Sequence, residues 1–317
     1  MQGFLVRRLV LVVPTLFLAS LVIFAIITLA PGDPVRMMLG TQATPDEVAQ
    51  ERARLGLDRP VPVRYAIWMT HVLRLDLGRS QVNDQPVARL VLQAFPYTLR
   101  LTAGALAVSV LIGFAIGILA ALRQNRPADL VFTGLASLGL AVPSFWLGIL
   151  LILLFSVTLG WLPPSGVAES GAPPLAALRY LVLPVVTVAV SNLSVFSRFV
   201  RTAMLEVLTA HYIRTARAKG LGERSVVIRH ALRNALIPVV TILGIQFGRL
   251  LGGALITEAV FAYPGIGRLV VTSILNRDYP MVQAALMLVV LIFLVANTIV
   301  DISYAYLDPR VKMGEAR

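Results

Sequence analysis

Twenty-two consecutive residues near the start of this sequence, 9 to 30, carry no charged side chain. A helix of that length rises about 1.5 Å per residue and therefore reaches across a hydrocarbon core of about 30 Å. Only 14% of the 317 residues are charged, whereas a soluble domain carries about a quarter. Because the charges cluster between apolar runs, the sequence predicts helices that cross a lipid bilayer.

Six such runs predict an all-α, polytopic integral membrane protein with six transmembrane helices. Their approximate ranges are 9–30, 101–122, 130–168, 180–197, 236–257 and 279–300. The third run is too long for one straight span, and we expect Pro143 to kink it. The first run is too long for the apolar part of a signal peptide and has no small-residue cleavage site, so we interpret it as a span.

The polar segment from residue 31 to 100 carries seven acidic and nine basic residues. The sequence Thr44-Pro45-Asp46-Glu47 is typical of a helix start, since a proline and two acidic residues occupy the first turn. Gly56 is expected to end that helix. The segment is therefore predicted to be a small helical domain outside the membrane and packed against it.

Basic residues in short loops indicate which side of the membrane each loop occupies. Loop 198–235 carries eight basic and two acidic residues, and fifteen basic residues in all fall on its side of the membrane. The loops 159–179 and 258–278 hold only three between them. Both termini and loop 198–235 are therefore predicted to be cytoplasmic.

Loop 198–235 also has the pattern of two capped helices. Residues 206–219 form a predicted short helix, with Glu206 near its start, cations in its last turn and Gly220 at the left-handed C-cap position. A second amphipathic helix is predicted over 223–236. An ordinary basic loop that only fixes topology is the alternative, but small residues within a capped helix favour close docking onto another protein.

The first helix of this loop resembles the EAA motif of binding-protein-dependent ABC importer permeases. That motif is a Glu-Ala-Ala triplet, three residues and a glycine, followed further along the chain by a hydrophobic residue and Leu-Pro. Strict matches are Ala216, Gly220 and Leu232, and departures are Arg214, His230 and Arg233. The stretches 212–221 and 229–238 look like the variant of the dipeptide, oligopeptide and nickel branch.

Further motifs of that branch extend over nearly the whole chain. They lie at 31–34, 55–58, 64–68, 76–80, 258–267, 277–283 and 297–310. The resemblance implies a type I ABC importer transmembrane fold in three parts. These are an N-terminal span with its external loop domain (1–94), the transmembrane domain with its coupling loop (95–306), and a cytoplasmic tail (307–317).

The resemblance also implies partners in a bacterial or archaeal cell membrane. They are a second homologous permease, two ATP-binding subunits that use Mg-ATP, and an external solute-binding protein that delivers short peptides, nickel or another small solute. The loop helix would be the ATPase-coupling helix. Its implied residues are Tyr212, Thr215, Ala216, Arg217, Lys219, Gly220 and Leu221.

This chain itself is not expected to be an enzyme or to bind a cofactor. Neither of its two lysines lies in the Gly-Lys-Ser/Thr sequence of a P-loop. There is no cysteine and the three histidines are scattered, so no metal site is predicted. The net charge of +12 could indicate nucleic-acid binding, but the basic residues flank apolar spans, where anionic lipid headgroups lie.

Two features inside the predicted fifth span could be functional. Gly244, Gly248 and Gly252 repeat every fourth residue, which favours helix packing, with a conformational hinge as the alternative. Arg249 is the only charged residue well inside a predicted span. It could face the solute path and attract a substrate carboxylate, or its side chain could extend to the external interface.

Two other classes of protein fit the sequence less well. A secondary transporter usually buries carboxylates near the middle of the membrane, whereas all sixteen acidic residues here lie in predicted loops or at span ends. A membrane-bound enzyme would need nucleophile–base or metal-ligand spacing, and the external segment, with His71 as its one histidine, has none. The ABC importer permease is therefore preferred.

Overall fold

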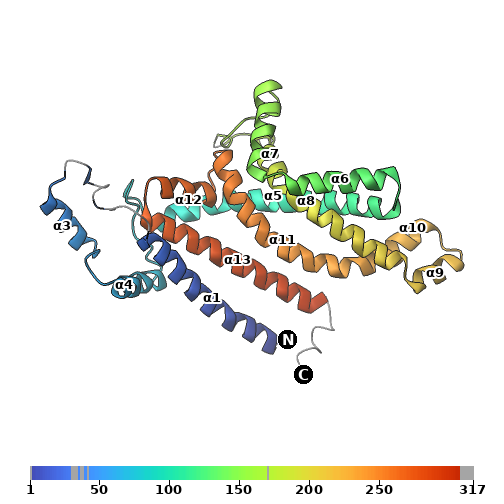
Figure 1. Ribbon diagram of the computed structural model, residues 1–317, viewed down its shortest axis with the longest axis horizontal. Coiled ribbons are helices and arrows are strands. Elements are labelled where there is room, and N and C mark those ends of the chain that lie inside the picture. The colour runs from blue at the N-terminus through green and yellow to red at the C-terminus, as the bar shows by residue number, and fades with distance from the viewer. Residues whose placement is uncertain (1, 30–34, 36–38, 41–42, 170, 308–317) are drawn as a thin grey trace.

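The computed structural model describes residues 2–29, 35, 39–40, 43–169 and 171–307. Over these residues the chain is an elongated bundle of helices (Figure 1). An isolated bridge joins Arg79 to Pro86. The helices begin with α1 (Gln2–Leu29), α3 (Pro45–Arg54), α4 (Val61–Leu73), α5 (Val87–Leu122), α6 (Pro127–Ala141), α7 (Ser144–Leu151) and the π-helix η1 (Ile152–Thr158). They continue with α8 (Pro174–Leu208), α9 (His211–Ala218), α10 (Glu223–Ser225), the π-helix η2 (Val226–Leu232), α11 (Arg233–Val260), α12 (Ile266–Leu275) and α13 (Tyr279–Leu307).

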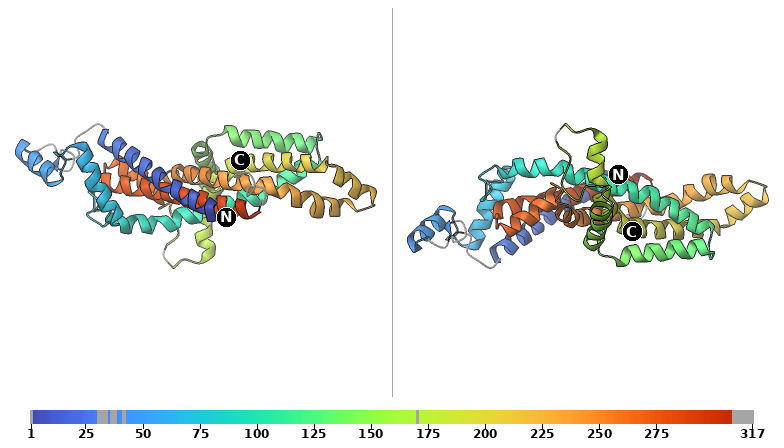
Figure 2. Two further views of the ribbon diagram at one scale, coloured as in Figure 1. Left: turned by 90° about the horizontal axis from the view of Figure 1, so that it is seen from below. Right: turned by 90° about the horizontal axis from the view of Figure 1, so that it is seen from above.

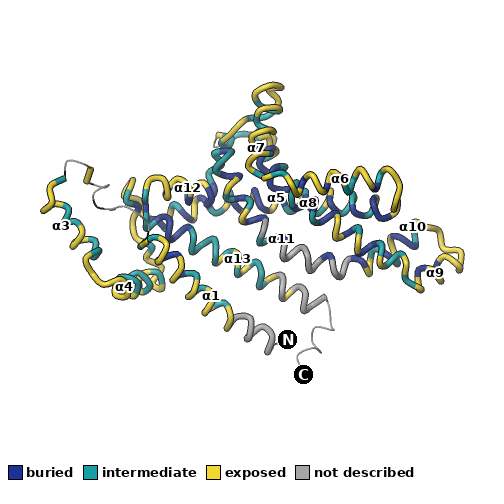
Figure 3. Tube along the Cα trace, viewed as in Figure 1, coloured by how far each residue is buried: buried dark blue, intermediate teal, exposed yellow. Residues whose placement is uncertain are grey.

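The helices α5, α8 and α11 form the centre of the bundle. Their buried residues gather in two clusters, one around Phe196 and Met204 and the other around Leu101 and Leu250. Figure 3 shows these buried positions along α5 and α8, whereas α3 is largely exposed. Glycine allows α5 and α8 to approach closely, because a Cβ on Gly117 would lie 2.7 Å from a backbone oxygen of α8.

Four helices among the described residues are long and apolar enough to cross a membrane. They are α1, α5, α8 and α13, and a fifth crossing results if α6, α7 and η1 are taken as one bent span. The all-helical, multi-pass architecture is thus as predicted. A sixth crossing would require α11, which is 28 residues long, so the count of six and the cytoplasmic termini stay predictions.

The third predicted span is broken rather than kinked. Its two parts meet at 103°, and Val142 between them is extended, with φ −81° and ψ 122°. Proline has no backbone N–H and disfavours helical geometry in the residue before it, so Pro143 ends α6 and begins a new helix. As a result α7 points away from the bundle, as Figures 1 and 2 show.

The external segment has the expected first helix and a further one. Thr44 caps α3 by a capping box, accepting from the Glu47 backbone N–H at 3.3 Å while its own N–H donates to the Glu47 carboxylate at 2.8 Å. Gly56 follows α3 with φ +65°. The helix α4 packs on α1 through the hydroxyls of Ser20 and Tyr65, which are 2.8 Å apart.

A buried carboxylate fastens the external segment to the start of α13. Asp278, 3% exposed, accepts a hydrogen bond from the Ser80 hydroxyl and another, of 3.1 Å, from the Gln81 backbone N–H. Two motifs that are about 200 residues apart in the sequence therefore meet here. The predicted boundary between residues 94 and 95 lies within the continuous helix α5.

Candidate coupling site

The short helix α9 lies at one end of the bundle, where the chain turns back from α8 toward α11 (Figure 1). It begins at His211, because Ala210 is extended, with ψ 148°. The predicted helix start near Glu206 was wrong. That residue belongs to α8, which continues to Leu208 and so passes beyond the end of the predicted span at residue 197.

The end of α9 is closed by a Schellman motif, as the glycine predicted. Gly220 has φ +78°, a left-handed geometry that costs other residues free energy. Its N–H donates to the Arg217 carbonyl at 2.9 Å, and the Leu221 N–H donates to the Ala216 carbonyl at 3.3 Å. These bonds satisfy the last carbonyls of the helix and fix where the chain leaves it.

The helix α9 has an inner and an outer face. On the inner face Ile213 and Ala216 are buried, packed in a cluster that includes Met204 of α8 and Val226 of η2. The other six residues implied for coupling are exposed, either on the outer face of α9 or in the turn that ends it: Tyr212, Thr215, Arg217, Lys219, Gly220 and Leu221. The small side chain of Ala216, 7% exposed, thus allows α9 to pack closely against α8 and η2 of the same chain.

Polar contacts hold α9 to the helices that follow it. The Arg217 guanidinium donates two hydrogen bonds to the Glu223 carboxylate, at 2.6 and 3.1 Å. This contact lowers the pKa of Glu223 and raises that of Arg217. The side-chain amide of Asn234 in α11 donates to the Tyr212 hydroxyl at 3.0 Å. The helix α9 is therefore linked near one end to α10 and near the other to α11.

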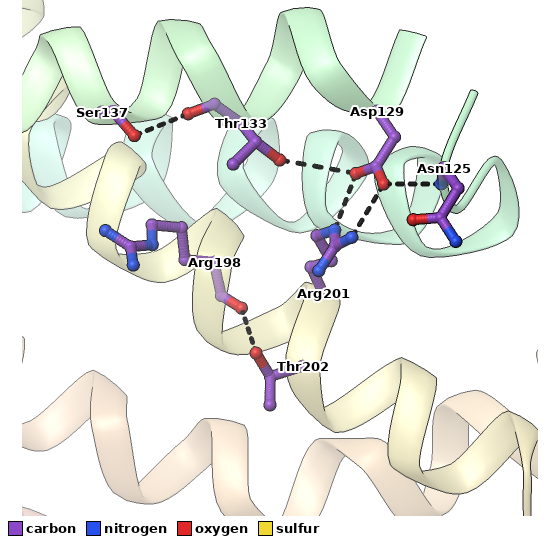
Figure 4. A network of polar contacts seen from close by, with 7 residues as sticks. All are labelled: Asn125, Asp129, Thr133, Ser137, Arg198, Arg201 and Thr202. Carbon is purple, nitrogen blue, oxygen red and sulfur yellow. Dashed lines mark hydrogen bonds and ion pairs between the residues drawn. The ribbon is translucent and has the colours of Figure 1, made fainter. Parts of the chain in front are cut away.

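A buried ion pair joins α6 to α8 two helical turns before α8 ends (Figure 4). Both oxygens of Asp129 accept hydrogen bonds of 2.7 Å from the Arg201 guanidinium. The carboxylate also accepts from the Asn125 backbone N–H at 3.0 Å and from the Thr133 hydroxyl at 3.4 Å. This pair is not predicted from the sequence, in which its two residues are 72 positions apart.

A second contact that the sequence did not predict lies deeper in the bundle, between α8 and α11. The amide of Gln246 donates to the Asn192 side-chain oxygen at 3.2 Å, and both side chains are buried. Side-chain hydrogen bonds between membrane helices stabilise their association by about 0.6 kcal/mol on average. The helix α9 is thus connected, through α8 and α11, to a bundle in which side-chain contacts join α6 to α8 and α8 to α11.

The residues predicted inside the fifth span have differing surroundings. A Cβ on Gly248 would overlap the ring of Phe293 in α13, whereas nothing lies within 4 Å of the same position on Gly252. The side-chain surroundings of Gly244 and Arg249 lie outside those that the structure describes. Helix packing by the glycine stripe and a solute-path role for Arg249 therefore stay predictions.

The fold matches solved transmembrane subunits of ABC importers. A chain of the MetNI methionine ABC transporter, in an inward-facing conformation, superposes with a TM-score of 0.60 at 20% identity, covering 71% of this chain and 99% of that one. A chain of an amino acid ABC transporter superposes with a TM-score of 0.52 at 16% identity, covering 70% and 94%. The protein therefore has the transmembrane fold of an ABC importer permease.

Sequence comparison places the chain more narrowly. Residues 113–313 match the family described as binding-protein-dependent transport system inner membrane component, and residues 1–102 match its N-terminal region. The chain belongs to this family. It is a multi-pass, non-catalytic permease subunit of the bacterial inner membrane, and ATP hydrolysis belongs to separate subunits.

Two groups of relatives match over almost their entire length. The glutathione transport system permease protein GsiC of Salmonella typhimurium is 43% identical over 312 residues, covering 98% of this chain and 99% of the relative. A putative peptide transport system permease protein of Brucella suis is 40% identical over 311 residues, with the same coverage.

Proposed function

We propose that this permease forms half of the translocation pore of an ATP-driven importer for short peptides. A second, similar permease supplies the other half, two ATP-binding subunits use Mg-ATP, and an external binding protein delivers the solute. The names of the glutathione and peptide relatives support the choice of substrate. The same machinery importing nickel or another small solute is the alternative.

The observation that carries this proposal is that α9 exposes one face at the end of the bundle while the rest of the chain holds it in place. Its exposed surface presents Tyr212, Thr215, Lys219 and Leu221, while its inner face and both ends are held by the same chain. A helix fixed in this way transmits a displacement instead of absorbing it. We propose that α9 docks on an ATP-binding subunit on the cytoplasmic side, which fits the six-span topology with both termini in the cytoplasm.

Movement of α9 would pass into the membrane along three connections. The helices α8 and α11 are direct continuations of the loop, and the Asp129–Arg201 pair extends the connection to α6. The core from residue 95 to 306 would tilt with them, and the N-terminal part, residues 1–94, would stay beside it. The tail, residues 307–317, would lie in the cytoplasm.

Reconstitution of the assembled transporter tests the coupling. Lys219→Glu on the exposed face of α9 should lower binding-protein-stimulated ATP hydrolysis and uptake together. Arg74→Glu, an exposed residue outside α9, serves as the matched charge reversal and should leave both rates unchanged. Uptake by the isolated chain without ATP would instead favour a secondary transporter.

The substrate is tested separately on the external binding protein. Mass spectrometry of ligands released from it should identify short peptides, such as glutathione-like tripeptides. Recovery of a nickel chelate and no peptide would select the alternative solute.

Arg249 and the glycine stripe are proposed to act inside the fifth span. Arg249 would face the solute path and attract a carboxylate, and Gly244, Gly248 and Gly252 would allow close helix packing. Arg249→Ala should then weaken uptake of anionic peptides more than that of neutral peptides. An unchanged rate and an unchanged preference would remove Arg249 from the path.

A further inference from the structure

A cavity of about 640 Å³ lies between the external segment and two membrane helices. One wall consists of residues in the last two turns of α1, including Phe24 and Ile27. The adjoining wall consists of residues in the first turns of α13, including Tyr279 and Met287. Because both helices are long enough to cross the membrane and reach the cavity with their ends, the cavity lies at the membrane surface.

The opposite wall of the cavity is cationic. Its charged residues come from α3, α4 and the turns that follow each of them: Arg52, Arg54, Arg59, Arg64 and Asp76. Arg54 is paired with Glu51 at 2.5 Å, and Asp76 lies 3.3 Å from the Nδ1 of His71. Among the described residues, the side chains of Arg59 and Arg64 form no ion pair.

Aromatic side chains also line the cavity. Trp68 lies against Phe24, with ring centroids 5.6 Å apart, and Tyr279 lines the cavity from α13. Tryptophan and tyrosine are enriched at the level of lipid headgroups. The cavity thus combines apolar, aromatic and cationic groups, which suit the acyl chains, the interfacial region and the phosphate of a phospholipid.

We propose that this cavity binds one anionic phospholipid, with its phosphate held by Arg59 and Arg64 and its acyl chains along α1 and α13. A free phosphate ion would leave the apolar wall without a role.

Lipid retention measured on the assembled transporter tests this site. The complex is exchanged from nanodiscs of equal phosphatidylglycerol and phosphatidylcholine content into detergent, and native mass spectrometry counts the lipids that remain. The wild-type complex should retain phosphatidylglycerol in preference to phosphatidylcholine. Arg59→Gln with Arg64→Gln should reduce that retention roughly 30-fold, at about fivefold for each arginine near a lipid surface.

Two controls decide whether the effect belongs to the cavity. Arg74→Gln removes one charge from the same segment without lining the cavity, and it should leave retention unchanged. The charge-conserving Arg59→Lys and Arg64→Lys pair should keep the preference for phosphatidylglycerol. This pair and the wild-type preference also test the site if the glutamine variants fail to assemble.

Three results would overturn the proposal. The first is equal retention of both lipids by the wild-type complex. The second is displacement of phosphatidylglycerol by millimolar inorganic phosphate, which would make free phosphate the ligand. The third is unchanged lipid retention with lost affinity for the external binding protein in the glutamine variants, which would make the cationic wall a protein contact.

Discussion

Replacing Arg201 should loosen the end of the bundle that carries α9. The substitution Arg201→Gln leaves the carboxylate of Asp129, 3% exposed, without its guanidinium partner. Breaking a fully buried pair costs about 3–5 kcal/mol. Because the Arg201 side chain is 26% exposed and two other donors to Asp129 remain, we expect about 2–3 kcal/mol.

Thermal unfolding of the purified complex measures this effect. A loss of that size corresponds to a fall in Tm of about 5 °C for a chain of this length. The matched control is Arg198→Gln, because Arg198 lies one turn earlier on the same helix and is exposed. ATP-driven uptake should fall with Arg201→Gln while ATP hydrolysis persists, since α6 would no longer follow α8. Equal Tm values for the two variants would refute the proposed role of the pair.

Three further perturbations test the loop and the helix packing. Gly220→Ala should destabilise the end of α9 by about 1–2 kcal/mol, because residue 220 has a left-handed backbone geometry. Gly222→Ala is the control and should have no such effect, because residue 222 has an ordinary φ of −59°. Hydrogen exchange of the α9 amides compares the two variants. Gly117→Val should separate α5 from α8 and lower Tm, and Gly134→Val, with open space around it, is its control. Glu223→Gln should speed hydrogen exchange of α9 at pH 7. Because the pKa of this carboxyl is lowered in the folded chain, its stabilisation is present above the unfolded pKa and is lost as pH falls through the folded one, so the variant and the wild type should converge at low pH.

Structural features that depend on a few neighbouring residues were predictable from the sequence. The charge-free runs identified membrane helices, and Gly220 and Thr44 identified the end of α9 and the start of α3. Each of these depends on neighbours within a few residues, because capping and periodicity are local properties.

Features that depend on distant residues were not predictable from one sequence. Asp129 and Arg201 are 72 residues apart, and nothing local indicates that they meet. The inward direction of Ala216 follows from packing against α8 and η2, not from the motif that contains it. Pro143 predicted a disturbance in the helix, but the angle of 103° is set by what the two halves pack against.

Site-directed cross-linking tests directly whether α9 is the helix that contacts the ATP-binding subunits. The natural sequence contains no cysteine, so a single Lys219→Cys variant gives an unambiguous label on the exposed face of α9. In the assembled transporter it should cross-link to a cysteine introduced on an ATP-binding subunit, with a yield that changes when ATP is added. A Val82→Cys control on the external segment should give no such product. Failure of Lys219→Cys to cross-link in a transporter that still performs ATP-driven uptake would contradict the assignment of α9 as the coupling helix.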